Sequence, residues 1–331
     1  MQHAASKTLA WSHGSFTTSA LGGMTAPVEF HSSRGKPFSP LAEAPWAAAS
    51  LPQAIPGHIR GLRGVFPCLP FGISAMPQDA PLEWRVLETK NDNAMHGDGA
   101  NGMWRFDDAQ PESLRLVFEH ADVDAIAMSS QTITPAPDRP AISFSYSAMP
   151  RYSVRLPFGF HVMLKWEDGM QLRPGLFTHG LCYPGTLQPG PMMTAPEGSF
   201  KSLETVPSRA GTLDMTRPDW PGPAEDVVML CGAAGRFSVL YPNQRRRLDI
   251  RWDAAIMPSC LLWFSRFGLT EEPWNRRYTA IGIEPIAAAF DFLPEVSACQ
   301  NPLTEMGVAT SISLSKDIAF STTLHLEALA T

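Results

Sequence analysis

The chain has 331 residues, of which 44% are hydrophobic and 18% are charged, a composition typical of a soluble globular protein with a substantial core. Its net charge of −6 gives no electrostatic basis for binding nucleic acid. No run approaches the roughly 18 consecutive apolar residues of a membrane span, and no apolar segment follows the N-terminus as in a secretory signal. Five cysteines without a C-x-x-C pair favour buried, reduced thiols, so we expect a cytoplasmic protein without membrane contact.

The many turn-forming residues, 31 prolines and 25 glycines, suit short strands better than long helices. Residues 1–55 are rich in Ala, Ser, Pro and Gly and show weak periodicity. We therefore expect one or two opening strands there, followed by a long, loosely structured connection. Trp11 and Trp46 indicate that parts of this segment pack against the rest of the chain. We expect residues 1–331 to form a single domain.

Apolar and polar residues alternate in short runs along the rest of the chain, with turn signals between the runs. This pattern predicts strands at residues 113–119, 141–147, 151–156, 236–241, 247–252, 261–265, 311–314 and 323–327. Helical periodicity is nearly absent, so the sequence predicts an all-β fold, a large twisted antiparallel β-sandwich. Residues 175–223 are interrupted by many prolines, and we expect long loops there over one rim of the sandwich.

A strand near the C-terminal end has two unlike faces. In residues 278–285, Ile281 and Ile283 point to one side and can be buried between two sheets. The opposite side carries two minimal side chains, at 280 and 282, and then Glu284. A hollow with a carboxylate at its rim could receive a sugar or another small polar ligand. Taken alone, the same pattern also fits a strand that ends in a solvated glutamate.

Two histidines lie in unusual local sequences. His96 lies in a glycine-rich loop that ends at Trp104, and His161 lies within the mostly apolar run 156–164. Each has an ordinary explanation when taken singly, because a turn residue and a hydrogen-bonded core histidine would look the same.

Together these stretches resemble the aldose 1-epimerase (galactose mutarotase-like) superfamily. The resemblance rests on HGDGANGMW at residues 96–104, PFGFH at 157–161 and GIEP at 282–285. It is supported by GVFP at 64–67 and by RLDIRWD at 247–253, which leads toward the glutamate as in that family. The motifs are short, but they occur in the family's order and cover roughly residues 60 to 330.

The resemblance implies a galactose mutarotase-like supersandwich that interconverts the α and β anomers of an aldose. Glu284 would remove the proton from the C1 hydroxyl, and His161 would donate a proton to the ring oxygen, so that the ring opens. His96 would hydrogen-bond the ring oxygen or a neighbouring hydroxyl. This acid–base chemistry needs no metal and no cofactor. The expected partner is a small aldose, phosphorylated or not, and the oligomeric state is left open.

The sequence also departs from the family pattern. Members of the family often carry a sugar-binding arginine shortly after the Phe-Pro element, whereas residues 71–74 read FGIS here. Arg60 or Arg63, just upstream, could take that role. The strand before the glutamate has no convincing counterpart of the aspartate that galactose-specific members use. The further predicted sugar contacts are Asn101, Trp104 and Trp263, with core packing as the alternative role of the tryptophans.

Weaker features of the sequence leave other functions open. A non-catalytic carbohydrate-binding or sugar-sensing protein is the main alternative, because the family arginine is missing. A lyase or hydrolase on the same fold is a third possibility. A phosphorylated sugar would need a basic cluster, which Arg151, Arg155 or Arg173 could supply. His179 and Cys182 have metal-ligand spacing but lack a second pair, so we expect no metal site.

Overall fold

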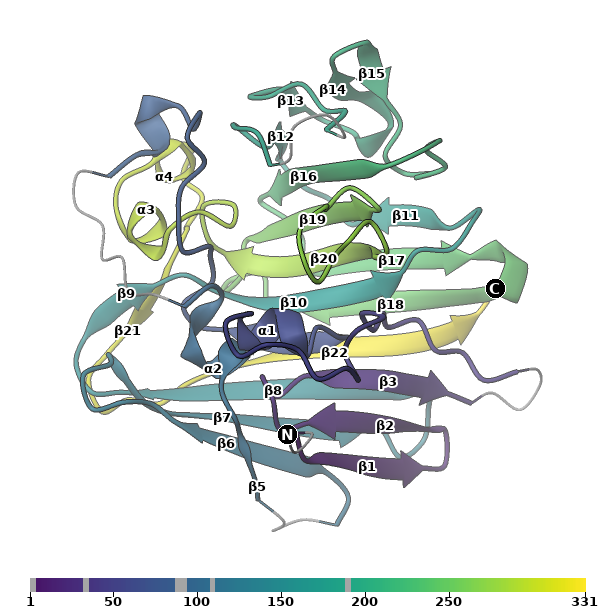
Figure 1. Ribbon diagram of the computed structural model, residues 1–331, viewed down its shortest axis with the longest axis vertical. Helices are drawn as coiled ribbons and strands as arrows, with labels where there is room; N and C mark the ends of the chain where they lie inside the picture. Colours follow the sequence, from purple (N-terminus) through teal and green to yellow (C-terminus); the bar gives the residue numbers. More distant parts are fainter. Residues whose placement is uncertain (1–3, 32–35, 87–93, 108–110, 188–191) are drawn as a thin grey trace.

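The computed structural model describes residues 4–31, 36–86, 94–107, 111–187 and 192–331. Two large antiparallel sheets stack face to face, with the ten-stranded sheet in front of the eight-stranded sheet in Figure 1. Strands hold 45% of the residues and helices only 9%, which confirms the predicted all-β class.

The ten-stranded sheet has the order β1-β2-β3-β4-β10-β20-β19-β16-β12-β13. Its strands are β1 (Ser6–Trp11), β2 (Gly14–Ser19), β3 (Thr25–Phe30), β4 (Val65–Cys68), β10 (Phe158–Lys165), β20 (Thr279–Ala287), β19 (Ser259–Arg266), β16 (Ala224–Cys231), β12 (His179–Cys182) and β13 (Ser199–Phe200).

The eight-stranded sheet has the order β11-β17-β18-β22-β8-β7-β6-β5. Its strands are β11 (Gln171–Pro174), β17 (Arg236–Tyr241), β18 (Arg246–Trp252), β22 (Phe320–Ala330), β8 (Ala141–Pro150), β7 (Ile126–Pro135), β6 (Leu114–Glu119) and β5 (Arg105–Asp107). Every strand predicted between 113 and 327 is present within a few residues, either in these two sheets or in the pair of β21 (Ile312–Leu314) with β9 (Val154–Leu156).

Helices are short and lie in the connections. The α-helices are α1 (Gly57–Arg60), α2 (Gly97–Asn101), α3 (Pro294–Ala298) and α4 (Pro302–Glu305), and the 3-10 turns are η1 (Leu82–Trp84), η2 (Leu203–Thr205) and η3 (Pro242–Gln244). Helices α1 and α2 lie in front of the ten-stranded sheet in Figure 1. None of the helices in the described residues is long and apolar enough to cross a membrane.

The two faces of β20 are buried in different cores, as its alternation predicts. Ile281 and Ile283 belong to the core between the sheets, together with residues of the opposite sheet such as Phe144 and Ile250. Ala280 faces a second core, which covers the outer side of the ten-stranded sheet. This second core places a packed layer over the face that carries Glu284.

The opening segment is more regular than predicted. Residues 1–55 contain three strands, β1 to β3, which extend the ten-stranded sheet, and Trp46 is fully buried. Edge strands with mixed small and polar residues give a weak pattern, because only one of their faces packs on the core.

The proline-rich segment 175–223 also carries more structure than long loops alone. It contains β12, β13, η2 and the hairpin of β14 (Val206–Ser208) with β15 (Gly211–Leu213), at the top of Figure 1. Residues 188–191 lie outside the described residues. All five cysteines are free, and four are buried as expected, whereas Cys299 is exposed.

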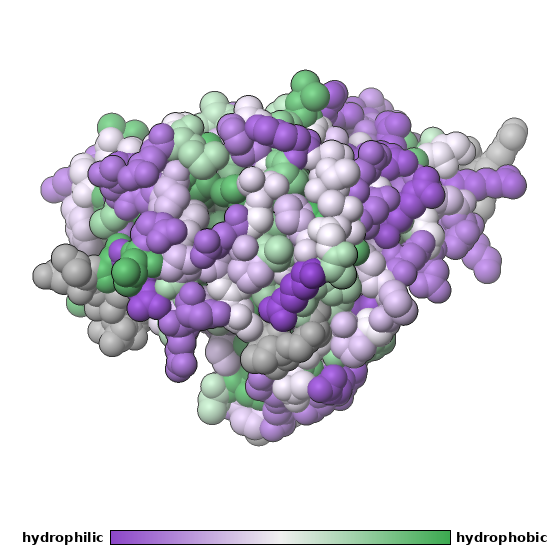
Figure 2. Space-filling view, turned by 90° about the horizontal axis from the view of Figure 1, so that it is seen from above, coloured by the Kyte–Doolittle hydropathy of each residue, from purple (hydrophilic) through white to green (hydrophobic). Residues whose placement is uncertain are grey.

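The view from above shows polar residues over most of this face, with apolar residues scattered between them (Figure 2). Scattered apolar side chains are normal on a protein surface.

Candidate functional site

A cavity of about 260 Å³ lies over the outer face of the ten-stranded sheet and contains all three side chains predicted to be catalytic. Strands β10, β16, β19 and β20 form its floor, and the segments around α1 and α2 form part of its wall. The lining residues are His58, Ile59, Leu62, Ile73, Met95, His96, His161, Leu187, Glu225, Val227, Leu261, Trp263, Leu269, Trp274, Glu284 and Asp291.

Glu284 and His161 face each other on neighbouring strands. The pairs Phe158↔Ala287 and Met163↔Gly282 bracket them, and the same offset sets His161 opposite Glu284. His161 Nε2 lies 3.6 Å from Glu284 Oε1, and both side chains are almost fully buried. This contact joins residues that are more than a hundred positions apart in the sequence.

Burial governs the charge of this pair. It raises the pKa of Glu284 well above its usual value, and the negative charge of Asp291 raises it further. Burial also lowers the pKa of His161 to about 3, with a smaller contribution from His58. A separation of 3.6 Å would suit an ion pair. The free energy needed to desolvate both charges, however, exceeds the electrostatic attraction gained from one such contact. Both shifts favour the uncharged forms, a protonated carboxyl group and a neutral imidazole.

The imidazole of His161 is oriented by packing. It stacks on Phe66, with ring centroids 4.6 Å apart and planes inclined by 13°. The His96 ring meets it edge-on at 5.3 Å. Nδ1 of both histidines is buried without a hydrogen-bond partner in the described residues. Each of these two nitrogens is therefore a buried polar atom whose hydrogen-bonding capacity is unused within the described residues.

A third histidine, which the sequence analysis did not single out, completes the group. His58 meets His96 edge-on with ring centroids 5.3 Å apart. Asn101 Nδ2 donates to the carbonyls of Met95 and Gly97, which fixes Oδ1 as the acceptor for His58 Nδ1 at 3.0 Å. The Nε2 atom of a neutral His58 is then an acceptor. Asn101, predicted to bind the sugar, instead positions His58 and does not line the cavity.

Two further acids line the cavity without having been predicted. Glu225, on β16, accepts hydrogen bonds from the Trp263 indole and from Ser265 Oγ, and burial raises its pKa to about 8. Asp291 follows β20, and burial raises its pKa to about 6. Trp263 lines the cavity as predicted, with its ring centroid 6.0 Å from that of His161.

The remaining predicted sugar contacts lie elsewhere. Arg60 and Arg63 line a separate hollow, and Arg63 pairs with Glu43 and donates to the carbonyls of Ala47 and Gly61. Trp104 is buried in the core between the sheets, where its indole donates to Gly99 O. None of these three side chains lines the cavity that contains Glu284.

Hydrogen bonds to Asp226 anchor the proline-rich segment to β16. The Asp226 carboxylate is fully buried and accepts hydrogen bonds from the backbone of Met193 and from the backbone and hydroxyl of Thr194. Asp226→Ala leaves those buried donors unpaired, so we expect the free energy of unfolding to fall by about 2 kcal/mol in urea titrations. Thr194→Val removes only the hydroxyl donor and should cost about half as much. An equal loss for both variants would contradict this account.

Comparison with solved structures identifies the fold. The chain is similar to a putative aldose 1-epimerase from Escherichia coli K12, with a TM-score of 0.65 and 15% identity over 99% of both chains. It is also similar to a GalM/aldose epimerase homologue from C. elegans, with a TM-score of 0.62 and 14% identity over 99% of both chains. A putative mutarotase from Salmonella typhimurium gives a TM-score of 0.63 at 9% identity, over 100% of this chain and 92% of that one.

These likenesses confirm the predicted architecture. The chain has the galactose mutarotase-like fold. No family model matches the sequence, and no curated protein matches it.

Proposed function

We propose that this protein interconverts the anomers of a small, unphosphorylated aldose by acid–base catalysis. The observation that carries the proposal is the contact of 3.6 Å between His161 Nε2 and Glu284 Oε1 on the floor of the cavity. The volume of about 260 Å³ lies just below the roughly 300–1,000 Å³ of sites for drug-sized ligands, as suits a single monosaccharide. Trp263 and Trp274 add apolar walls for the C–H face of a sugar.

The proton inventory of the pair is compatible with this reaction. At rest Glu284 and His161 share one ionisable proton, which lies on the carboxyl group. Moving it to His161 creates a carboxylate and an imidazolium, and sugar hydroxyls replacing water can stabilise both. Glu284 then takes the proton of the C1 hydroxyl while His161 protonates the ring oxygen, and the ring opens.

Reversal of these steps completes the exchange. Rotation about the C1–C2 bond presents the other face of the aldehyde, and the two transfers run backward. Each cycle returns the same single proton to the pair, so no metal or external acid is needed. His96 and His58 would hold the ring oxygen or a neighbouring hydroxyl with their ring nitrogens.

The lack of cationic side chains among the described lining residues favours a neutral sugar. Glu225, Glu284 and Asp291 line the cavity, whereas no lysine or arginine does so among the described residues. A phosphate group would need cationic donors. We expect NMR of anomer exchange to show acceleration for free aldoses and at least about tenfold lower kcat/KM for their 6-phosphates. Faster exchange of the phosphates would contradict the assignment to neutral sugars.

A non-catalytic sugar-binding protein is the second candidate. It is favoured by the lack of an arginine among the described lining residues and by the neutral resting state of the Glu284–His161 pair. Saturable binding of an aldose in ligand-observed NMR, without faster anomer exchange, would support this candidate over the isomerase.

A further inference from the structure

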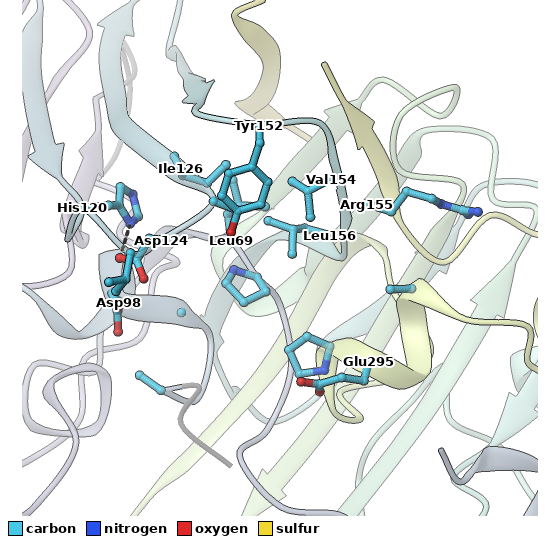
Figure 3. Close-up of a pocket in the computed structure, with 17 residues that line it drawn as sticks. Leu69, Asp98, His120, Asp124, Ile126, Tyr152, Val154, Arg155, Leu156 and Glu295 are labelled. Carbon is cyan, nitrogen blue, oxygen red and sulfur yellow. Dashed lines mark ion pairs between the residues drawn. The ribbon is translucent and has the colours of Figure 1, made fainter. Parts of the chain in front are cut away.

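A second and larger cavity, of about 470 Å³, is lined in part by residues of α2, with Asp98 among them (Figure 3). It is bordered by α2, by the turn between β6 and β7, by the stretch that leads into β9, and by α3. Figure 3 shows His120, Asp124 and Asp98 gathered at one end of it, while Arg155 and Glu295 lie away from them. Nothing in the proposed sugar chemistry uses this cavity.

The three grouped side chains have the geometry of metal ligands. One donor atom from each of Asp98, His120 and Asp124 lies within 4.8 Å of the others, and His120 Nδ1 is 4.0 Å from Asp124 Oδ2. Donor atoms that share an ion at about 2.1 Å lie roughly 3 to 4 Å apart. Asp98 is exposed, so a rotation of its side chain can provide the remaining approach.

His120 is held as metal-binding histidines usually are. Its side chain is only 5% exposed, and its Nε2 lies 2.9 Å from Ser129 Oγ, which in turn lies 2.7 Å from the Tyr146 hydroxyl. A hydrogen bond at the far ring nitrogen fixes both the tautomer and the ring orientation. When Nε2 donates to Ser129, the lone pair of Nδ1 points toward Asp124.

The carboxylates lack the partners that would normally neutralise them. Asp124 Oδ2 is buried and accepts no hydrogen bond in the described residues, although a neutral His120 lies beside it. No lysine or arginine in the described part of the chain pairs with Asp98 or Asp124. Two carboxylates and an imidazole lone pair around one point repel each other unless a cation lies between them.

The nearby Arg151 does not serve as that cation. Its guanidinium donates to the carbonyls of His120 and Ile126 and to the Asp122 carboxylate. These bonds hold the turn from 120 to 126 in place without involving the Asp124 carboxylate. The hydrogen bonds of Arg151 therefore hold the turn in a conformation that places His120 and Asp124 beside Asp98, without an ion being bound.

We propose that Asp98, His120 and Asp124 bind a divalent first-row transition metal ion at this end of the second cavity. The imidazole favours Zn²⁺ or Co²⁺ over Mg²⁺ and Ca²⁺, which prefer oxygen ligands alone. Three protein ligands leave coordination positions open toward the cavity. Because Asp98 lies on α2, two residues after His96, the bound ion would also fasten α2 against the β6–β7 turn.

Metal titration tests the site independently of any sugar chemistry. Protein freed of metal with EDTA is titrated with Zn²⁺ by calorimetry and with Co²⁺ by visible absorption, and we expect one ion per chain. Asp98→Asn and Asp124→Asn should each weaken binding by about 10- to 100-fold, with the fold checked by circular dichroism. Zn²⁺ should also raise the Tm of the parent protein more than that of the variants.

A matched control separates this site from adventitious binding. His31 lies 4.0 Å from Glu29, the same separation as His120 from Asp124, but both side chains are about half exposed. His31→Gln should leave the affinity and stoichiometry unchanged. The proposal is overturned if neither ion binds in the millimolar range, or if both aspartate variants bind as tightly as the parent. Asp98 is exposed, so its variant remains informative if Asp124→Asn fails to fold.

Discussion

Glu284→Gln is expected to reduce the enzyme-dependent rate of anomer exchange by about 10³-fold, within the range typical of losing a general base. The amide has nearly the shape of the protonated carboxyl group that burial favours here, but it cannot accept the proton of the C1 hydroxyl. Stability should therefore change little, since no buried charge is lost at rest. NMR exchange spectroscopy on a free aldose, with thermal unfolding alongside, measures both quantities.

Glu29→Gln provides the control for that experiment. It removes a half-exposed carboxylate that lies 4.0 Å from His31 and does not line the cavity, and it should leave the exchange rate unchanged. Exchange by Glu284→Gln at the parent rate would remove Glu284 as the base. Loss of sugar binding together with the rate would instead point to a role in recognition, as in the sugar-binding alternative.

The fold was largely predictable because alternation reports burial directly. Strands such as residues 141–147 and 247–252 have one face in the core between the sheets, so each apolar position repeats with period two. The opening strands β1 to β3 were underestimated for the same reason. They lie at one end of the sheet order, where β1 is the weakly buried edge strand and where small and polar residues fill many positions of β2 and β3.

The site residues that lie in short recognisable motifs could be predicted from the sequence. The site residues that only the packing of the chain brings to the cavity could not. Glu284, His161 and His96 were singled out, and all three line one cavity. His58 and Glu225 were not, because a lone histidine after a proline and an acid in a buried strand do not reveal which face they occupy. Only strand register shows that Glu225 faces the cavity side while its neighbour Asp226 is bound to the proline-rich segment.

The choice of arginines failed for a related reason. Arg60 and Arg63 were selected by their distance along the chain from the Phe-Pro element. The hollow that they line is separate from the one that contains Glu284. Closeness in sequence sets no direction for a side chain in an irregular connection, whereas within a strand it does.

At Gly282, the alternation of side chains between the two faces of a strand has a consequence for catalysis. Two residues before Glu284 on β20, this glycine lies on the same face, and a Cβ there would come within 2.4 Å of Glu284 Oε1 and 3.2 Å of Trp263 Cβ. The glutamate carboxyl group occupies the space that the missing side chain leaves. Gly282 is thus a positioning residue, and its lack of a side chain holds Glu284 where it meets His161.

Gly282→Ala is therefore expected to lower kcat by about 10²-fold, the cost of moving a reacting group by about 1 Å. The carboxyl group at the flexible end of Glu284 can swing aside, so the fold should persist and KM should change much less than kcat. Gly99→Ala is the matched control, because a Cβ there meets Trp104 at an ordinary 3.4 Å. If the Gly282 variant loses activity only in proportion to a loss of folded protein, its role is structural, and unchanged kcat would mean that Glu284 needs no such space.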